Sequence, residues 1–223
     1  MHIEPGVVDG AKIILSYATA IAALGFSAKT SIDMIKKDGF MSLISRSALT
    51  TILVFIFFEV MPHHAVGVSE VHFILGSTLF LVFGPAAAAI GLSLGLLAQG
   101  VFFAPFDLPQ YGMNLTTLLL PLFAMAAVAR RTITENTAYV DITYKQALQL
   151  SLTFQGGIIA WVAFWAFYGQ GFGAENMSSV ATFGLAYLTV VLIEPVLDLA
   201  VLAGAKSLHR FKHSSLLETR LFS

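Results

Sequence analysis

The chain has 223 residues, of which 57% are hydrophobic and only 11% are charged. About a quarter of the residues of a soluble domain are charged, so this composition excludes an ordinary soluble protein and predicts an integral membrane protein. The formal net charge of -1 argues against nucleic acid as a partner, and the absence of cysteine excludes disulfides and thiolate metal sites.

Seven apolar segments follow one another along the chain, and six of them approach the roughly 20 residues that a membrane-spanning helix needs. These six are residues 8–27, 43–61, 86–104, 115–129, 147–168 and 178–203. The seventh, residues 72–83, is short, and Gly84-Pro85 should end it because proline removes a backbone donor. The sequence predicts an all-α, polytopic bundle of about seven helical segments, with 72–83 packed inside it.

Basic residues indicate the orientation of this bundle, since cytoplasmic loops retain Lys and Arg. They gather in three places: Lys29, Lys36, Lys37 and Arg46; Arg130, Arg131 and Lys145; and Lys206, Arg210, Lys212 and Arg220. Only Lys12 is left near the other face. We expect a multi-pass protein of the cell membrane, the inner membrane in a Gram-negative source, with its N-terminus outside and its C-terminus in the cytoplasm. Residues 1–205 would form one transmembrane domain, and 206–223 a basic cytoplasmic tail.

The chain begins with Met1-His2, and a free amine followed by histidine is a chelator. The α-amine, the deprotonated amide of His2 and its imidazole can close fused five- and six-membered rings around one divalent ion. This nitrogen set suits Ni(II), Cu(II) or Co(II) better than Mg or Ca, which take oxygen ligands. We expect Met1 to be retained, because its removal requires a small second residue, and Glu4-Pro5-Gly6 is unlike the basic start of a signal peptide.

A fourth donor is needed, and the predicted topology places three more histidines on the outer face with His2. His63 and His64 lie in the loop before the third segment, and His72 opens that segment. One loop histidine is weak evidence, but four imidazoles and an amine on one face favour a metal site. For His63-His64 a plain polar loop is an equally good interpretation. The outer loop 104–111, with two prolines, is either a lid over this site or a plain connection.

Three stretches carry a family resemblance: Met1-His2-Ile3 with Gly6, Val71-His72 with Gly76 after it, and Gly112-Met113-Asn114. Together they resemble the cobalt/nickel substrate-specific component of energy-coupling-factor transporters, the CbiM/NikM family, over the chain to about residue 205. The resemblance implies a metal-capture domain that holds the ion with the amine of Met1, the amide and imidazole of His2, and His72. It also implies that Asn114 packs next to the site. His63-His64 is not part of the family pattern, and the choice between cobalt and nickel stays open.

The energy source has to come from elsewhere, because no G-x-x-x-x-G-K-[ST] phosphate loop is present. The resemblance implies a transmembrane coupling protein and cytoplasmic ATPase subunits as partners beside membrane lipid. It implies no cofactor beyond the transported Co(II) or Ni(II). We therefore expect an importer subunit and no enzyme. The alternatives are a metal-dependent membrane enzyme using His63, His64, Glu59 or Glu70, for which no H-E-x-x-H pair is present, and a vitamin-binding component of a similar transporter.

A pair of glycines and a pair of acidic residues inside the apolar segments bear on packing. Gly91 and Gly95 form a GxxxG pattern, which favours close helix contact within this chain over a docking face for a partner. Glu194 and Asp198 stand four residues apart in the last segment, where a charge costs about 2.5–3.5 kcal/mol on insertion scales. Pairing with Lys12 and protonation are both open for these two acids.

Overall fold

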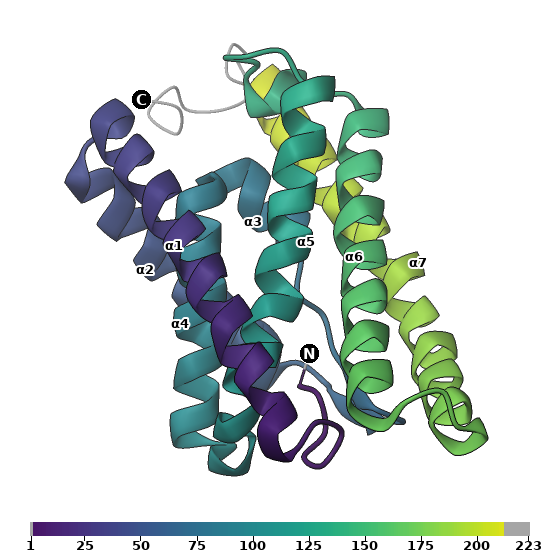
Figure 1. The fold of residues 1–223 in the computed structure, drawn as a ribbon. Helices are drawn as coiled ribbons and strands as arrows, with labels where there is room; N and C mark the ends of the chain where they lie inside the picture. Colours follow the sequence, from purple (N-terminus) through teal and green to yellow (C-terminus); the bar gives the residue numbers. More distant parts are fainter. Residues whose placement is uncertain (1, 212–223) are drawn as a thin grey trace.

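The structure, a computed structural model, describes residues 2–211 and is a bundle of helices (Figure 1). Within these residues seven α-helices follow in the order α1 (Ile13–Asp38), α2 (Phe40–Phe55), α3 (Gly76–Phe83), α4 (Pro85–Phe102), α5 (Tyr111–Thr132), α6 (Tyr144–Gln170) and α7 (Ala174–Phe211). Six helical stretches of the described chain are long and apolar enough to cross a membrane. The predicted polytopic helical bundle is therefore confirmed, with α3 as its one short member.

Short elements connect the long helices. Three of them are short 3₁₀ helices: η1 (Gly10–Lys12), η3 (Pro105–Gln110) and η4 (Tyr139–Asp141). A π-helical turn, η2 (Ile56–Val60), continues α2. Between η2 and α3 lies an antiparallel hairpin of β1 (His64–Val66) and β2 (Ser69–Val71). Gly67 forms its tight turn with φ of 65°, a positive value that two-residue hairpin turns require. The loop expected before the third segment is thus an ordered hairpin.

The third segment differs from the prediction at its start, because His72 does not open a helix. Residues 72–75 are not helical, and α3 begins only at Gly76. Leu75 adopts a left-handed conformation (φ 52°, ψ 38°), which is uncommon for a residue other than glycine. Non-helical backbone at membrane depth is tolerated where protein groups satisfy its polar atoms. Here Glu194 of α7 accepts a hydrogen bond from the amide of Ile74, which supports the unwound segment.

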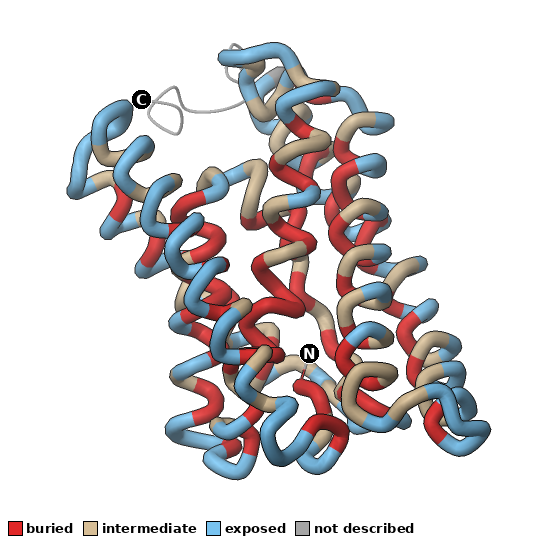
Figure 2. Tube along the Cα trace, in the orientation of Figure 1, coloured by how far each residue is buried: buried red, intermediate tan, exposed pale blue. Residues whose placement is uncertain are grey.

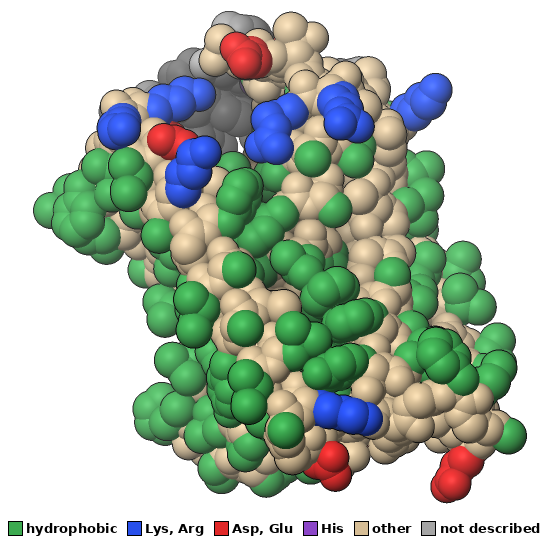
Figure 3. All heavy atoms as spheres, viewed as in Figure 1, with side chains coloured by type: hydrophobic (Ala, Val, Ile, Leu, Met, Phe, Trp, Pro, Cys, Tyr) green, Lys and Arg blue, Asp and Glu red, His purple; other side chains and the backbone are tan. Residues whose placement is uncertain are grey.

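The two ends of the described chain lie toward opposite ends of the bundle (Figure 1). Six long helices alone would return the chain to the end where it started. Residues 72–83 supply the additional passage, as an odd number of crossings requires. Figure 3 shows Lys and Arg side chains gathered at the end where α7 finishes, above an apolar girdle. By the positive-inside rule this end faces the cytoplasm.

Helix α5 forms the centre of the bundle, and its side chains are buried along most of its length (Figure 2). Helix α4 packs closely against α2 through Gly91 and Gly95. A Cβ atom at Gly91 would lie 2.3 Å from Thr50 Oγ1, and one at Gly95 would lie 2.5 Å from Val54 Cγ1. The GxxxG pattern therefore serves packing within the chain, as predicted.

Helix α7 is longer than the apolar segment 178–203 that predicts it. It continues without a break past residue 205 to Phe211, and Lys206 Nζ donates a hydrogen bond to the carbonyl of Val140 at 2.6 Å. Residues 212–223 lie outside the described part of the chain. The division into a domain of residues 1–205 and a tail of residues 206–223 stays a prediction.

Candidate metal centre

The N-terminal segment runs alongside β2 and pairs with it through an isolated β-bridge. Ile3 forms a β-bridge with Ser69, and the amide of Glu70 donates to the carbonyl of His2 at 2.9 Å. The Ser69 hydroxyl donates to the same carbonyl at 2.9 Å. Because these bonds use the backbone of residues 2 and 3, they fix the position of the His2 side chain without engaging it.

Asn114 of α5 holds the same segment from the side opposite to β2. Its Oδ1 atom accepts a hydrogen bond from the amide of Ile3 at 2.8 Å, and both residues are buried. An unpaired buried amide costs about 1–3 kcal/mol, so this contact contributes substantially to docking of the segment. The structure thus places Asn114 next to His2, where the family resemblance expects it.

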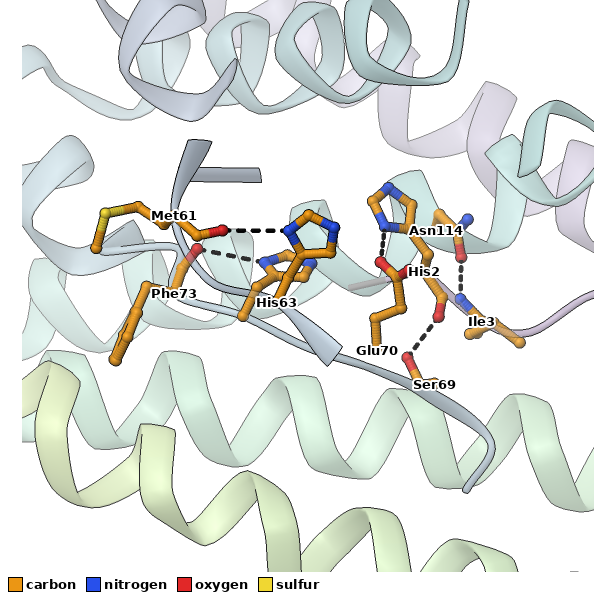
Figure 4. A network of polar contacts seen from close by, with 9 residues as sticks. His2, Ile3, Met61, His63, Ser69, Glu70, Phe73 and Asn114 are labelled. Atoms are coloured by element: carbon orange, nitrogen blue, oxygen red, sulfur yellow. Dashed lines mark hydrogen bonds and ion pairs between the residues drawn. The ribbon is translucent and has the colours of Figure 1, made fainter. Parts of the chain in front are cut away.

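His2 and His72 meet in the interior of the protein. Their side chains are among the most buried polar groups, with His2 2% and His72 1% exposed, and their ring centroids are 5.6 Å apart. Phe58 of η2 packs on both rings, and its ring centroid lies 6.0 Å from that of His2 and 4.6 Å from that of His72. Glu70 of β2 completes the group (Figure 4). One potential ligand atom from each of these two histidines and Glu70 lies within 4.8 Å of the others.

Hydrogen bonds orient both rings so that each keeps one nitrogen unengaged. His2 Nδ1 lies 2.5 Å from Glu70 Oε2, and His72 Nδ1 lies 3.3 Å from the carbonyl oxygen of Phe73. Burial lowers the pKa of His2, and this effect outweighs the hydrogen bond to Glu70, which raises it. A neutral His2 ring therefore donates its Nδ1 proton to Glu70. Neither His2 Nε2 nor His72 Nε2 has a hydrogen-bond partner among residues 2–211. Because buried nitrogens without partners are rare, this pair points to a ligand.

Glu70 adds a negative charge to the two imidazoles. Burial acts most strongly and raises the pKa of its carboxyl group, but the hydrogen bond with His2 and the attraction of the nearby basic groups together outweigh burial, and the pKa lies below its usual value. The carboxylate is therefore ionised at neutral pH. From the sequence, Glu70 is a candidate only for the alternative enzyme and is not expected beside His2. The available signal was its position two residues before His72, since alternate residues of a strand point to the same face.

The other predicted site residues occupy different positions. Met1 lies outside the described residues. His63 is half-buried, with Nδ1 3.1 Å from the carbonyl oxygen of Met61 (Figure 4). His64 is exposed on β1. Within residues 2–211, the group of possible ligands around His2 includes neither of them. The structure thus brings His2 and His72 together and leaves His63-His64 outside the centre.

The outer loop 104–111 is packed against the centre. It contains η3, in which Asp107 is buried, and Asp107 lines a small cavity together with His2, Gln99 and Asn114. The loop therefore borders the site, as a covering segment would. Asp107 adds a second carboxyl group to the surroundings of His2.

Gly169 of α6 allows the N-terminal segment to lie against that helix. A Cβ atom at this position would fall 1.9 Å from the carbonyl oxygen of Val7. We expect Gly169→Ala to displace the segment that carries His2 and to lower the Co(II) affinity about tenfold or more, as loss of a supporting contact around a metal site does. Gly156→Ala on the same helix is the matched control, because its Cβ would meet nothing within 4 Å. Titration of both variants with Co(II) checks this prediction, and equal affinities would contradict it.

Comparisons with known proteins indicate a family for this fold. A family model described as the cobalt uptake substrate-specific transmembrane region (CbiM) matches residues 2–210. Two solved structures share the fold. One, a transition metal transporter, is 19% identical over 100% of both chains, with a TM-score of 0.70. The other, a truncated transition metal transporter, is 19% identical over 90% of this chain and 96% of that chain, with a TM-score of 0.69.

No curated protein matches the sequence. The two structural likenesses, at 19% identity, show the fold alone. The family model also indicates the class of protein, because it spans nearly the whole chain. Its family consists of metal transport components and not of enzymes. The chain therefore belongs to the family of the cobalt uptake substrate-specific transmembrane region, and it is a multi-pass membrane component of metal transport.

Proposed function

We propose that this chain is the substrate-binding subunit of an ATP-driven importer of the energy-coupling-factor type, which captures Co(II) or Ni(II) from outside the cell. The observation that supports it most is the pair of buried imidazoles, His2 and His72. Each has an Nε2 atom without a partner among the described residues, and an ionised carboxylate lies beside them. Imidazole nitrogens are good ligands for both ions.

The proposed ligands are four nitrogens: the amine of Met1, the amide and the imidazole of His2, and the imidazole of His72. A six-membered chelate ring at His2 uses Nδ1, the atom that now bonds to Glu70 at 2.5 Å. Binding through Nδ1 therefore requires the neutral ring to carry its proton on Nε2, so the ion replaces the hydrogen bond from Nδ1 to Glu70. Glu70 then remains next to the ion, and its carboxylate offsets one of the two positive charges that enter the buried site.

A second ligand set uses the side chains as they stand. His2 Nε2, His72 Nε2 and a Glu70 oxygen would hold the ion without the N-terminal amine. The unpartnered Nε2 atoms within residues 2–211 favour it. The two sets differ in one testable respect, because only the first requires a free amine on Met1.

Glu70→Gln separates the charge of Glu70 from its size. Under the first ligand set, glutamine keeps a hydrogen-bond acceptor for His2 but removes the charge that balances the ion. We expect the Co(II) affinity to fall about 10-fold to 100-fold, the usual effect of losing a neighbour of a metal ligand. The matched control is Glu59→Gln in η2, a partly buried acid that is not in the group around His2. Calorimetric titration of both variants measures the difference, and equal losses would assign the effect to general surface charge.

The proposed partners are a transmembrane coupling protein and cytoplasmic ATPases, since the chain carries no phosphate loop of its own. The test is purification of the full chain through a tag placed after residue 223, so that Met1 is unmodified. We expect the coupling protein and ATPases to accompany it and to support ATP-dependent uptake of Co(II) or Ni(II) in cells. Uptake by this chain without any ATPase would contradict the proposal.

A further inference from the structure

Two carboxylates of α7 are buried inside the membrane-spanning part of the bundle. Glu194 is 0% exposed and Asp198 is 4% exposed. Residues four apart lie on the same face of a helix, so both point to the same neighbours. Neither pairs with Lys12, whose Nζ atom donates a hydrogen bond to the carbonyl of Gly169 at 2.6 Å. Acids at such depth are costly and are therefore expected to have a function.

Glu194 binds the unwound segment that follows His72. It accepts one hydrogen bond from the amide of Ile74, two residues after His72, and another from Gln155 Nε2 of α6. The hydroxyl of Tyr187 donates to Gln155 Oε1 at 2.5 Å, so the amide of Gln155 is fixed at both ends. Glu194 is thus held by α6 and α7 and in turn holds the backbone beside His72.

Asp198 binds the first turn of α3, where the unwound segment ends. Its carboxylate accepts hydrogen bonds from the hydroxyls of Ser77 and Thr78, the latter at 2.5 Å. A negative charge is favourable next to the N-terminus of a helix, because the helix dipole is positive there. Asp198 therefore fixes the start of α3, as Glu194 fixes the residues before it.

Together these contacts surround a strained piece of backbone. Leu75 lies between Ile74 and α3 in a left-handed conformation, which persists only where the surroundings hold it. We infer that Glu194 and Asp198 are positioning residues for His72: they hold the unwound segment so that the His72 ring stays beside His2. This inference rests on the proposed function. By this inference, α7 supports the ion ligand His72, and the same helix continues to the cytoplasmic end of the bundle.

The test uses Cu(II) as the probe ion, because its electron paramagnetic resonance spectrum reports the number of nitrogen ligands. The N-terminal chelate keeps three nitrogens without His72. The full chain is loaded with Cu(II) as wild type, His72→Ala, Glu194→Gln and Asp198→Asn. Glu175→Gln is the matched control, because Glu175 is an exposed acid in the first turn of α7. Size-exclusion chromatography establishes that each variant is folded.

We expect the spectrum of Glu194→Gln to shift from that of the wild type toward that of His72→Ala, because a displaced His72 ring binds the ion more weakly but is still present, with a Co(II) affinity about 10-fold to 100-fold lower. Asp198→Asn should shift in the same direction, so it provides the test if Glu194→Gln does not fold. General destabilisation would not produce the His72→Ala spectrum. Wild-type spectra and affinities in both folded variants would overturn the inference alone. No Cu(II) binding by the wild type, or a wild-type spectrum for His72→Ala, would instead overturn the proposed function.

Discussion

Replacing His72 with alanine is expected to abolish measurable Co(II) and Ni(II) binding while the bundle stays folded. The variant removes one of two buried imidazoles whose Nε2 atoms have no partner within residues 2–211. Within residues 2–211, the Nδ1 atom of His72 bonds only to the carbonyl of the adjacent Phe73, so the substitution breaks no hydrogen bond between distant elements there. The unwound segment keeps its contact with Glu194. Loss of a metal ligand with the fold preserved is therefore the expected result.

The same loss is expected for His2→Ala, which removes the imidazole of the proposed chelate. The backbone hydrogen bonds that dock this segment use the carbonyl of His2 and the amide of Ile3, so alanine keeps them and loses the side-chain bond to Glu70. His64→Ala is the matched control, because His64 is exposed on β1. Calorimetric titration with Co(II) and Ni(II), together with a thermal unfolding curve for each variant, measures both effects. Normal affinity in His2→Ala and His72→Ala would place the ion elsewhere.

Acidification is expected to weaken Co(II) binding by at least about 100-fold between about pH 7.5 and about pH 5.5, because an α-amine has a pKa of about 7.7–8.0. The amine binds the ion only when deprotonated, so each pH unit below its pKa costs about tenfold. The amide proton released from His2 adds to this loss. The His2 ring adds less than an exposed imidazole would, because burial lowers its pKa. Affinity therefore rises with pH.

This pH dependence separates the two proposed ligand sets. Without the amine, the ion would depend on His2, His72 and Glu70, and the pKa values of His2 and Glu70 are both lowered. Those two groups remain in their binding forms as the pH falls, so the loss would be smaller. Titrations in buffers of different ionisation enthalpy count the protons released. An affinity that does not change with pH would contradict the amine chelate.

The long helices could be predicted from the sequence because a membrane requires long apolar segments, and such segments are visible locally. Their ends could not. Helix α1 runs to Asp38, well past the apolar segment that ends near residue 27. Its last turns contain Lys36 and Lys37, charged residues that stay helical beyond the hydrocarbon region. Apolar composition reports only the part of a helix that lies in lipid.

The surroundings of His72 show what the sequence could not predict. Its neighbours Phe73 and Ile74 are apolar and suit a helix, yet the backbone there is unwound and bonded to Glu194, 120 positions further along the chain. No local signal encodes that contact. Glu70 was missed for a related reason, since β2 has only three residues and alternation is hard to detect in so short a strand. Residue type and topology predict His2, His63, His64 and His72 on one face, and the choice of His72 among them comes from the family resemblance.

In the proposed function, the N-terminal amine and His2 chelate the transported ion. The most direct measurement is a Co(II) and Ni(II) titration of the purified full chain beginning at Met1, beside a version extended by a few residues ahead of it. The extension removes the α-amine from the site and keeps His2, Glu70 and His72 in the sequence. We predict tight binding by the unextended chain alone. Equal binding by both would contradict the chelate and assign the ion to the three side chains.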